Sequence, residues 1–134
     1  MAHHIAIFVP SLRGGGAERV MATLANGFAA RGHRVDLVLV RAEGPYLPQV
    51  ADTVRIFDLG KGKVSASLLP LARYLHRERP DAMLSALSHA NVIAILARKL
   101  ARVRTRLVIS ERNSLTARPA DMSGKVVRSL MTWL

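Results

Sequence analysis

The chain has 134 residues, carries a formal net charge of +11 at pH 7 and contains no cysteine. This length suits one domain with a single core, and the lack of cysteine excludes a disulfide framework and any thiolate metal site. A chain this basic attracts anions such as phosphate esters, nucleic acid or an acidic membrane, or is simply rich in arginine without a specific partner.

The apolar residues predict strands that alternate with helices. Residues 5–10 (IAIFVP) form a continuous apolar run, typical of a strand buried on both faces and too short for a signal peptide or a membrane span. From Ala17 onward apolar residues recur with helical spacing, and Gly32 is expected to end that helix. Further strands are predicted at 35–40, 54–59 (nearer an edge), 82–87 and 106–110, and further helices at 65–79, 91–102 and from 123.

Two of these helices contain a residue that suits the first turn. Pro70 is expected inside the first turn of the helix at 65–79, and Asn91 is a candidate N-cap of the next one. The alternation of strands and long crossovers predicts an α/β fold, in which a Rossmann-like, doubly wound parallel sheet carries helices on both faces. Because the sequence stops inside an apolar helical stretch (SLMTWL), we expect it to be part of a longer protein.

Gly14, Gly15 and Gly16 lie between the first strand and the first helix. Ligands of open α/β sheets bind beyond the carboxyl ends of the strands, and a helix N-terminus favours phosphate. Glycine removes the side chain that would block approach and permits positive φ, so these residues could face a diphosphate or could simply form a tight turn. The loop is not a Walker A motif, and Arg19 occupies the third glycine position of a dinucleotide fingerprint. No acid closes the second strand, so a dinucleotide site is disfavoured.

The segment from Ile5 to Val40, with its "GGGAERV" and "RGHRVDLV", resembles the opening of glycosyltransferase family 4, whose members are retaining enzymes with the two-domain GT-B fold. Later segments, "LSALSHANVIAILARKLA" and "RLVISERNS", are also similar to that family, so the resemblance extends to about Arg128. It implies that residues 1–134 are the N-terminal, acceptor-binding domain, and that the C-terminal donor-binding domain is absent from this sequence. The expected reaction moves a sugar from a nucleotide-sugar donor to a glycan or lipid-linked acceptor.

The resemblance also implies how such an enzyme works. The nucleotide-sugar is a co-substrate, and neither a cofactor nor a catalytic metal is expected. We expect hexosyl transfer only when the donor domain is joined, and no activity from this chain alone. The expected location is the cytoplasm, on the inner face of the membrane where the acceptor is a lipid-linked precursor of envelope polysaccharide or glycolipid.

The family match implies roles for residues at three strand ends. The loop Gly14–Gly16 would face the donor diphosphate. His89 is the candidate catalytic group, since it could bind phosphate or an acceptor hydroxyl, or transfer a proton near neutrality. The candidate acceptor-binding residues are Glu18, Arg19, Ser88, Asn91, Glu111, Arg112 and Asn113. Arg112 would contact an anionic acceptor and Glu111 an acceptor hydroxyl.

Each of these residues also has a simpler interpretation. Glu18 would complement the helix dipole, and Arg19 would lie along the helix surface in water. His89 would be a solvated loop histidine. Glu111 and Arg112 would form a salt bridge that fixes their loop.

Residues 97–106 (ARKLARVRTR) form a dense basic stretch. A solvated helix face is the default interpretation, and contact with an anionic membrane surface is the sharper one. Nucleic-acid binding would call for stacking aromatic residues, and the chain is only 4% aromatic, so no nucleic-acid partner is expected. The alternative to a glycosyltransferase is a basic α/β module that binds phosphate or an anionic membrane without chemistry.

Overall fold

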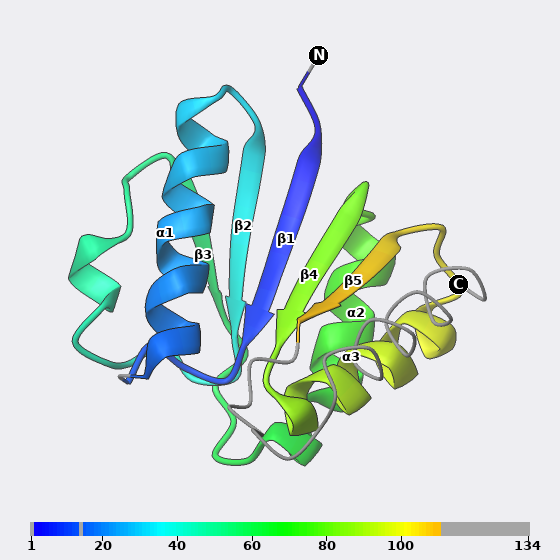
Figure 1. Ribbon diagram of the computed structural model, residues 1–134. Coiled ribbons are helices and arrows are strands. Elements are labelled where there is room, and N and C mark those ends of the chain that lie inside the picture. Colours follow the sequence, from blue (N-terminus) through cyan, green and yellow to red (C-terminus); the bar gives the residue numbers. More distant parts are fainter. Residues whose placement is uncertain (1, 14, 111–134) are drawn as a thin grey trace, which may run out of the picture.

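The computed structural model describes residues 2–13 and 15–110 (Figure 1). They form a sheet of five parallel strands in the order β3-β2-β1-β4-β5. The strands are β1 (His4–Val9), β2 (Arg34–Leu39), β3 (Val54–Asp58), β4 (Ala82–Ala86) and β5 (Arg106–Ser110). The α-helices are α1 (Gly16–Ala30), α2 (Leu68–Glu78) and α3 (Ser88–Ala101), and two short 3₁₀ helices are η1 (Leu47–Gln49) and η2 (Val64–Ser67).

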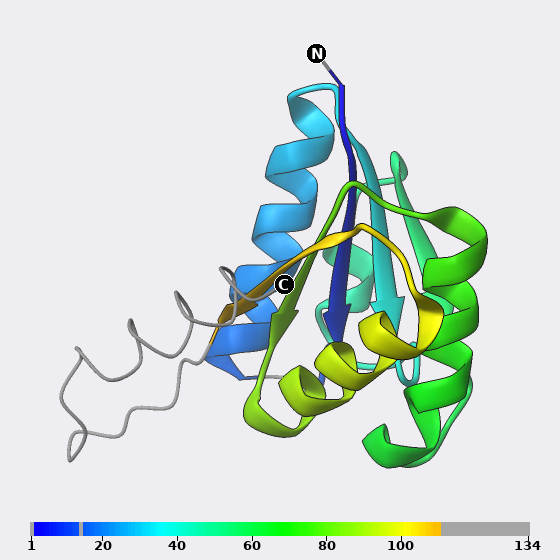
Figure 2. The ribbon, with the colours of Figure 1, turned by 90° about the vertical axis from the view of Figure 1, so that its right-hand side faces the viewer.

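The sheet lies between two layers of helix. Figure 2 shows α1 on one face and α2 with α3 on the other. On β1, Ile7 and Val9 join the core under α1, whereas Ala6 and Phe8 join the core under α2 and α3. Because successive side chains of a strand point to opposite faces, a strand covered on both sides reads as a continuous apolar run. The predicted α/β fold with a parallel sheet and helices on both faces is therefore confirmed.

Local sequence signals explain the ends of α1 and α2. Gly32 has a φ of +89° directly after the C-cap residue of α1, a conformation that glycine adopts at little cost. Pro70 lies in the first turn of α2, where its missing N–H group removes no helical hydrogen bond. The β3 strand is at the edge of the sheet, as its alternating pattern predicts.

The predicted start of α3 is wrong. The helix begins at Ser88 and its N-cap residue is Leu87, so Asn91 lies inside the helix and is 4% exposed. Leu87 has a φ of +80°, a conformation that a leucine rarely adopts. Because the N-cap residue is apolar, the sequence contains no capping residue that would mark this helix start. The helix predicted from residue 123 lies outside the described residues.

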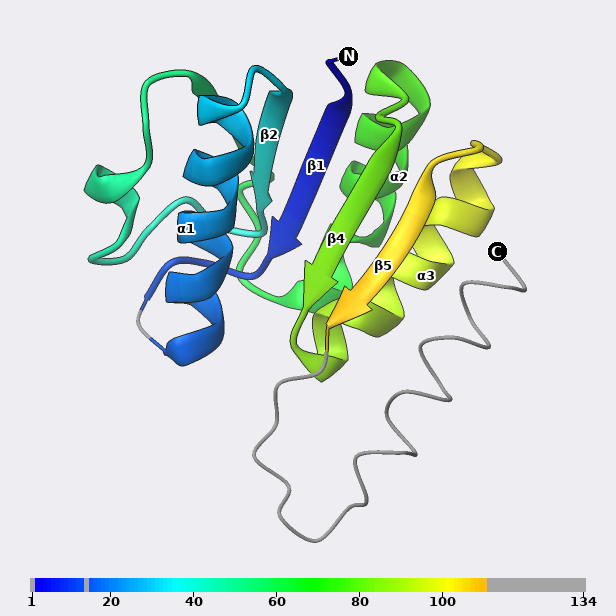
Figure 3. The same ribbon diagram turned by 45° about the horizontal axis from the view of Figure 1, so that its top comes forward.

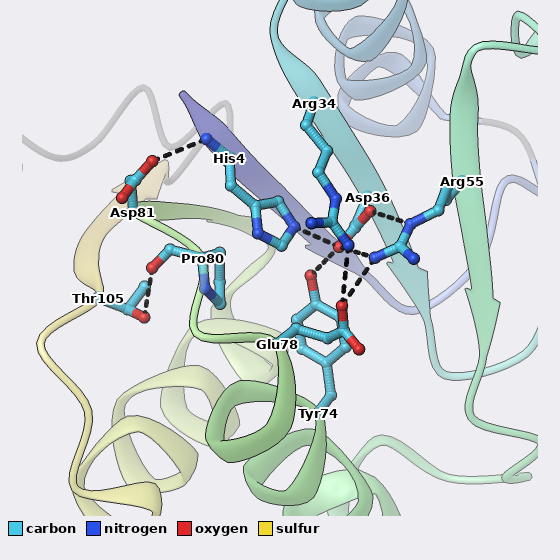
Figure 4. Close-up of polar contacts among 9 residues, drawn as sticks. All are labelled: His4, Arg34, Asp36, Arg55, Tyr74, Glu78, Pro80, Asp81 and Thr105. Atoms are coloured by element: carbon cyan, nitrogen blue, oxygen red, sulfur yellow. Dashed lines mark hydrogen bonds and ion pairs between the residues drawn. The ribbon is translucent and has the colours of Figure 1, made fainter. Parts of the chain in front are cut away.

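A buried carboxylate joins the amino ends of three strands to α2 (Figure 4). Asp36, on β2, has no exposed surface. It accepts two hydrogen bonds from the guanidinium of Arg55 on β3, at 2.9 and 3.1 Å, and one from the hydroxyl of Tyr74 on α2, at 2.6 Å. Nε2 of His4 on β1 lies 2.5 Å from its Oδ2. Arg55 also donates to Glu78 of α2 at 2.8 Å, and this second bond joins β3 to the end of that helix.

The hydrogen bonds decide the charge of this group. Burial alone would raise the pKa of the Asp36 carboxyl, but the hydrogen bonds from Arg55, Tyr74 and His4 outweigh burial and hold the pKa below its ordinary value. Burial, and then the hydrogen bond to Asp36, raises the pKa of the Tyr74 hydroxyl. Asp36 is therefore an ion in the folded protein, and Tyr74 remains a donor.

A second fixed contact supports the loop between β1 and α1. Leu12 donates its N–H to the carbonyl of Glu43 at 2.9 Å and accepts a bond from the N–H of Tyr46 at 3.3 Å. Gly44 lies between Glu43 and Tyr46 in the sequence and has a φ of +121°. A β-carbon on Gly44 would lie 2.0 Å from the carbonyl oxygen of Leu12. Only glycine can occupy this position, so the segment that follows β2 holds the first half of the β1–α1 loop.

Replacing the buried carboxylate should strongly destabilise the fold. We expect Asp36→Asn to lower the free energy of unfolding by about 3 kcal/mol, because the amide cannot accept from all the donors that now surround the carboxylate. The matched control is Asp52→Asn at an exposed position, for which we expect a change within about 0.5 kcal/mol. Urea unfolding followed by circular dichroism measures both, and equal stabilities of the two variants would contradict the role of Asp36.

The same residue gives a pH dependence. The pKa of Asp36 is lower in the folded than in the unfolded protein. The charge of Asp36 therefore contributes fully to the free energy of unfolding above the ordinary aspartate pKa of about 3.9. This contribution is lost as the pH falls through the lower pKa of the folded protein. We expect the stability difference between wild type and Asp36→Asn to shrink below about pH 4, as measured by urea unfolding across this range. A constant difference would show that the charge of Asp36 plays no part.

Substituting Gly44 should displace the loop that it supports. We expect Gly44→Ala to lower the free energy of unfolding by roughly 2 kcal/mol, because its β-carbon meets backbone and its φ is unfavourable for any L side chain. Gly62→Ala is the control, since a β-carbon there meets nothing within 4 Å. Urea unfolding compares the two, and an equally small effect at both positions would show that the contact between Gly44 and Leu12 is not tight.

Candidate functional site

The direction of chain winding reverses between β1 and β4. From β1 the chain passes through α1 to β2 on one side, and from β4 it passes through α3 to β5 on the other side. Figure 1 shows the two connections leaving the same edge of the sheet in opposite directions. In open α/β sheets the carboxyl edge at such a reversal is where ligands bind. The candidate site is therefore the edge beyond β1 and β4.

Gly15 and Gly16 begin α1 at this edge. Gly15 is the N-cap residue, with φ −168° and ψ 166°, and no side chain hydrogen-bonds to this helix end. Extended backbone of this kind suits any residue, and a β-carbon on Gly16 would meet nothing within 4 Å. At these two positions, positive φ is therefore not the reason for glycine. Their effect is that neither residue places a side chain of its own over the first N–H groups of α1.

Glu18 lies against the start of its own helix. A β-carbon at Gly15 would lie 2.7 Å from Oε1 of Glu18, so the carboxylate folds back over the N-cap residue. This position complements the positive end of the helix dipole, and it also places an acceptor of hydrogen bonds beside the glycine loop. Arg19 is exposed and donates its backbone N–H to the carbonyl of Gly15 at 3.2 Å.

The start of α3 forms the other side of the site. A single residue, Leu87, separates the last residue of β4 from the first residue of α3. No side chain caps this helix by a hydrogen bond, so its first N–H groups also point towards the carboxyl edge. Ser88 and His89 lie in the first turn and are exposed.

Two buried polar atoms near this helix end lack a hydrogen-bond partner among the described residues. They are Oγ of Ser85, on β4, and Oδ1 of Asn91. The amide nitrogen of Asn91 donates to the carbonyl of Ser110 at 3.3 Å, which ties α3 to the end of β5. Asn91 is therefore a buried link between two elements of the site rather than an exposed cap.

The structure brings most of the described candidates to one edge. Gly15, Gly16, Glu18 and Arg19 lie at the start of α1, and Ser88, His89 and Asn91 at the start of α3. The two groups follow β1 and β4, which are paired neighbours in the sheet. Gly14, Glu111, Arg112 and Asn113 lie outside the described residues, so their predicted roles stay predictions.

The basic stretch at 97–106 does not form one surface. The guanidinium of Arg98 donates to the carbonyl of Thr105 at 2.5 Å and closes the turn after α3. Lys99 and Arg102 line a groove with residues of α2 and α3. Arg104 and Arg106 line a different cleft at the amino end of the sheet, together with His3, His33 and Asp81.

Sequence reasoning missed Asp36 and Ser85. Asp36 stands inside an otherwise apolar strand, and the lone acid in "VDLVLV" was the signal that a buried partner set exists. Ser85 is the polar residue of "AMLSAL", but nothing in that pattern indicates that its hydroxyl is buried without a partner. The burial of Asp36 and of Ser85 follows only from the arrangement of the strands and helices in the fold.

Residues 2–13 and 15–110 lack a metal-binding cluster and a helix that could span a membrane. They contain no group of three or more His, Cys, Asp or Glu side chains that could hold a metal ion. None of their helices is long and apolar enough to cross a membrane.

Comparisons with known proteins agree with the fold. The family model described as Glycosyltransferase Family 4 matches residues 14–134, which is nearly the whole chain. The comparison with curated proteins gave no match. The five-stranded parallel sheet is consistent with one half of a GT-B fold. With the family model covering both helix starts of the candidate site, the chain belongs to glycosyltransferase family 4.

Proposed function

We propose that this chain is the acceptor-binding half of a retaining glycosyltransferase, which moves a sugar from a nucleotide-sugar to a glycan or lipid-linked acceptor. The observation that carries the proposal is the pair of helix starts, α1 and α3, at the reversal between β1 and β4. Neither start has a side-chain cap, and uncapped helix N-termini favour phosphate.

In this proposal the start of α1 faces the donor diphosphate. Negative charge develops on the diphosphate as it leaves the sugar, and fixed N–H groups stabilise that charge without reorganising. Gly15 and Gly16 place no side chain of their own over these N–H groups, and only the flexible carboxylate of Glu18 lies close to Gly15. The Glu18 carboxylate must move away from the N-cap residue when the diphosphate arrives, and it can then accept a hydrogen bond from an acceptor hydroxyl.

The residues at the start of α3 would act on the acceptor. His89 is exposed in the first turn, where it could hold a phosphate or an acceptor hydroxyl. Ser88 would donate to the same acceptor, and Asn91 would keep α3 and β5 in register through its bond to Ser110. Glu111, Arg112 and Asn113 directly follow β5, so we place them on the acceptor side as well.

The first test uses the protein isolated from its native source. We expect an intact mass more than twice 14.6 kDa, since a GT-B enzyme has a second domain of similar size. We also expect release of nucleoside diphosphate from one member of a panel of nucleotide-sugars when cell glycans or lipids are added. The product's anomeric configuration, read by proton NMR, should match the donor's. A native mass near that of this chain, without release from any donor, would favour the non-catalytic module.

Blocking the glycine loop should abolish transfer without unfolding the protein. We expect Gly15→Trp to lower kcat/KM at least a hundredfold, because the indole covers N–H groups that are worth about that much each. The fold should tolerate the change, since the new β-carbon meets only the flexible carboxylate of Glu18. Gly62→Trp, in open space, is the control. Unchanged transfer by Gly15→Trp would remove the diphosphate role of this loop.

A variant of Arg112 tests acceptor binding separately from donor binding. We expect Arg112→Ala to raise the acceptor KM about tenfold, through loss of a charge-assisted hydrogen bond, and to leave the donor KM unchanged. Arg31→Ala, at an exposed position after α1, should change neither constant. Steady-state kinetics with each substrate varied in turn measures both, and an unchanged acceptor KM for Arg112→Ala would refute its assignment.

A further inference from the structure

A cleft at the amino end of the sheet lies at the edge opposite the candidate site. Its volume is 490 Å³, and pockets for small ligands span about 300–1,000 Å³. Because strands rise about 3.3 Å per residue, the length of β4 separates this cleft from the candidate site by about 15 Å. We call it the amino-edge cleft, and the residues that line it are the polar His3, His33, Asp81, Arg104 and Arg106 and the apolar Ile5 and Ala82.

The register of the sheet creates the hollow. Ile5 of β1, Ala82 of β4 and Arg106 of β5 are paired side by side across three neighbouring strands, so their side chains project from the same face of the sheet. Ile5 packs against the core under α1, and the cleft therefore opens on that face. The alanine in the middle of the row has the smallest of the three side chains and leaves space between the other two.

The two arginines of the cleft are carried by a fixed backbone. Arg104 and Arg106 are exposed, whereas Thr105 between them is 2% exposed, so the two arginines project from the same side of an extended segment. The hydroxyl of Thr105 donates to the carbonyl of Pro80 at 2.7 Å (Figure 4). The N–H of Arg106 donates to the carbonyl of Asp81 at 3.0 Å. These bonds hold the segment beside the start of β4.

The positive charge of the cleft lacks a partner. Within residues 2–13 and 15–110, neither Arg104 nor Arg106 has a side-chain hydrogen bond or an ion pair. By contrast, the guanidinium of Arg55 is held by two carboxylates. The acid that lines the cleft, Asp81, already accepts a hydrogen bond from the N–H of His4 at 2.8 Å (Figure 4). Two guanidinium groups thus face one carboxylate that is already bonded, and the group they lack is an anion.

The histidines supply a further donor. The N–H of His3 donates to Nδ1 of His33 at 3.1 Å, and the two rings are stacked with their centroids 5.6 Å apart. A ring nitrogen that accepts a hydrogen bond carries no proton, so the neutral ring of His33 carries its proton on Nε2. This N–H is available to a ligand in the cleft. The backbone contact therefore selects the tautomer of His33 that can donate.

We propose that the amino-edge cleft binds a small soluble anion that carries a phosphate or diphosphate group. A guanidinium donates two parallel N–H groups to phosphate oxygens. Residues two apart in an extended segment lie roughly 7 Å from each other, so Arg104 and Arg106 can both reach one diphosphate, with Nε2 of His33 as a third donor. Because these groups line a hollow, they favour a small anion over a flat bilayer. This ligand is separate from the diphosphate that the proposed function places at the start of α1.

Titration calorimetry with pyrophosphate at low ionic strength tests the proposal. We expect saturable binding that Arg104→Gln with Arg106→Gln weakens at least about tenfold, through loss of charge-assisted hydrogen bonds. The matched control is Arg73→Gln with Arg77→Gln, which removes the same charge from exposed positions on α2 and should bind as the wild type does. Gly15→Trp, which covers the start of α1, should leave the binding to the cleft unchanged.

Two single substitutions test the shape and the sign of the site. We expect Ala82→Leu to weaken pyrophosphate binding about tenfold, because the larger side chain fills the hollow without changing the charge. Asp81→Asn should strengthen binding about fivefold, since it removes a negative charge beside the anion. The amide oxygen of the new side chain can still accept the hydrogen bond from His4. Circular dichroism confirms that each variant is folded.

Four results would overturn the proposal. The first is no saturable binding of pyrophosphate by the wild type. The second is an equal loss of binding in the two double arginine variants, which would show that only net charge attracts the anion. The third is a loss of binding in Gly15→Trp alone, which would place the anion at the start of α1. The fourth is binding to anionic vesicles but not to pyrophosphate. None of these measurements uses a sugar donor or an acceptor, so the proposed function is tested separately.

Discussion

The handedness of parallel crossovers determines where this protein can hold a ligand. A right-handed connection carries α1 to one face of the sheet as the chain moves from β1 to β2. When the chain returns across β1 to form β4, the same handedness puts α2 and α3 on the other face. Figure 3 shows β1 and β4 side by side with their helices on opposite sides. The two connections therefore part at one edge, and the space between them is created by topology before any particular side chain is considered.

The amino edge and the carboxyl edge of the sheet differ in how their polar groups are paired. At the amino edge, the Asp36 carboxylate joins β1, β2, β3 and α2 through side-chain contacts of 2.5 to 3.1 Å. Such a network is expensive to disturb because a buried charge without partners is strongly unfavourable. At the carboxyl edge, the N-cap residues of α1 and α3 make no side-chain cap hydrogen bond, and Oγ of Ser85 and Oδ1 of Asn91 have no hydrogen-bond partner among the described residues. Among the described residues, the buried carboxylate at the amino edge therefore has its partners, whereas two buried side-chain oxygens near the carboxyl edge have none.

The sequence predicted the strands and the α-helices of the described residues, and their order along the chain. The signals that predicted these elements are local. They are the apolar runs of the buried strands, Gly32 after α1 and Pro70 in the first turn of α2, and each depends only on residues close to it in the chain. The family resemblance, which rested on several segments together, was also confirmed. The start of α3 could not be predicted in the same way. Leu87 adopts a conformation that its own chemistry disfavours, and only the packing around it explains why.

The candidate site was predicted at the level of strand ends but not of side chains. The glycine loop and the "SHAN" segment lie at one edge because parallel strands bring their carboxyl ends together. That Glu18 folds over Gly15, that Asn91 is buried, and that the basic stretch is divided between two surfaces all depend on contacts between elements.

The single residue between β4 and α3 also limits how the site can adapt to a substrate. With Leu87 as the whole connection, the start of α3 cannot shift unless β4 or the helix itself moves, and both are packed in the core. On the other side, Gly44 holds Leu12, whereas a β-carbon on Gly16 would meet nothing within 4 Å and one on Gly15 would meet only the flexible carboxylate of Glu18. Of the two described helix starts at this edge, the start of α1 is therefore the one with room to adjust to a substrate. The start of α3 is fixed to the sheet by its short connection, so a substrate must fit this side as it stands.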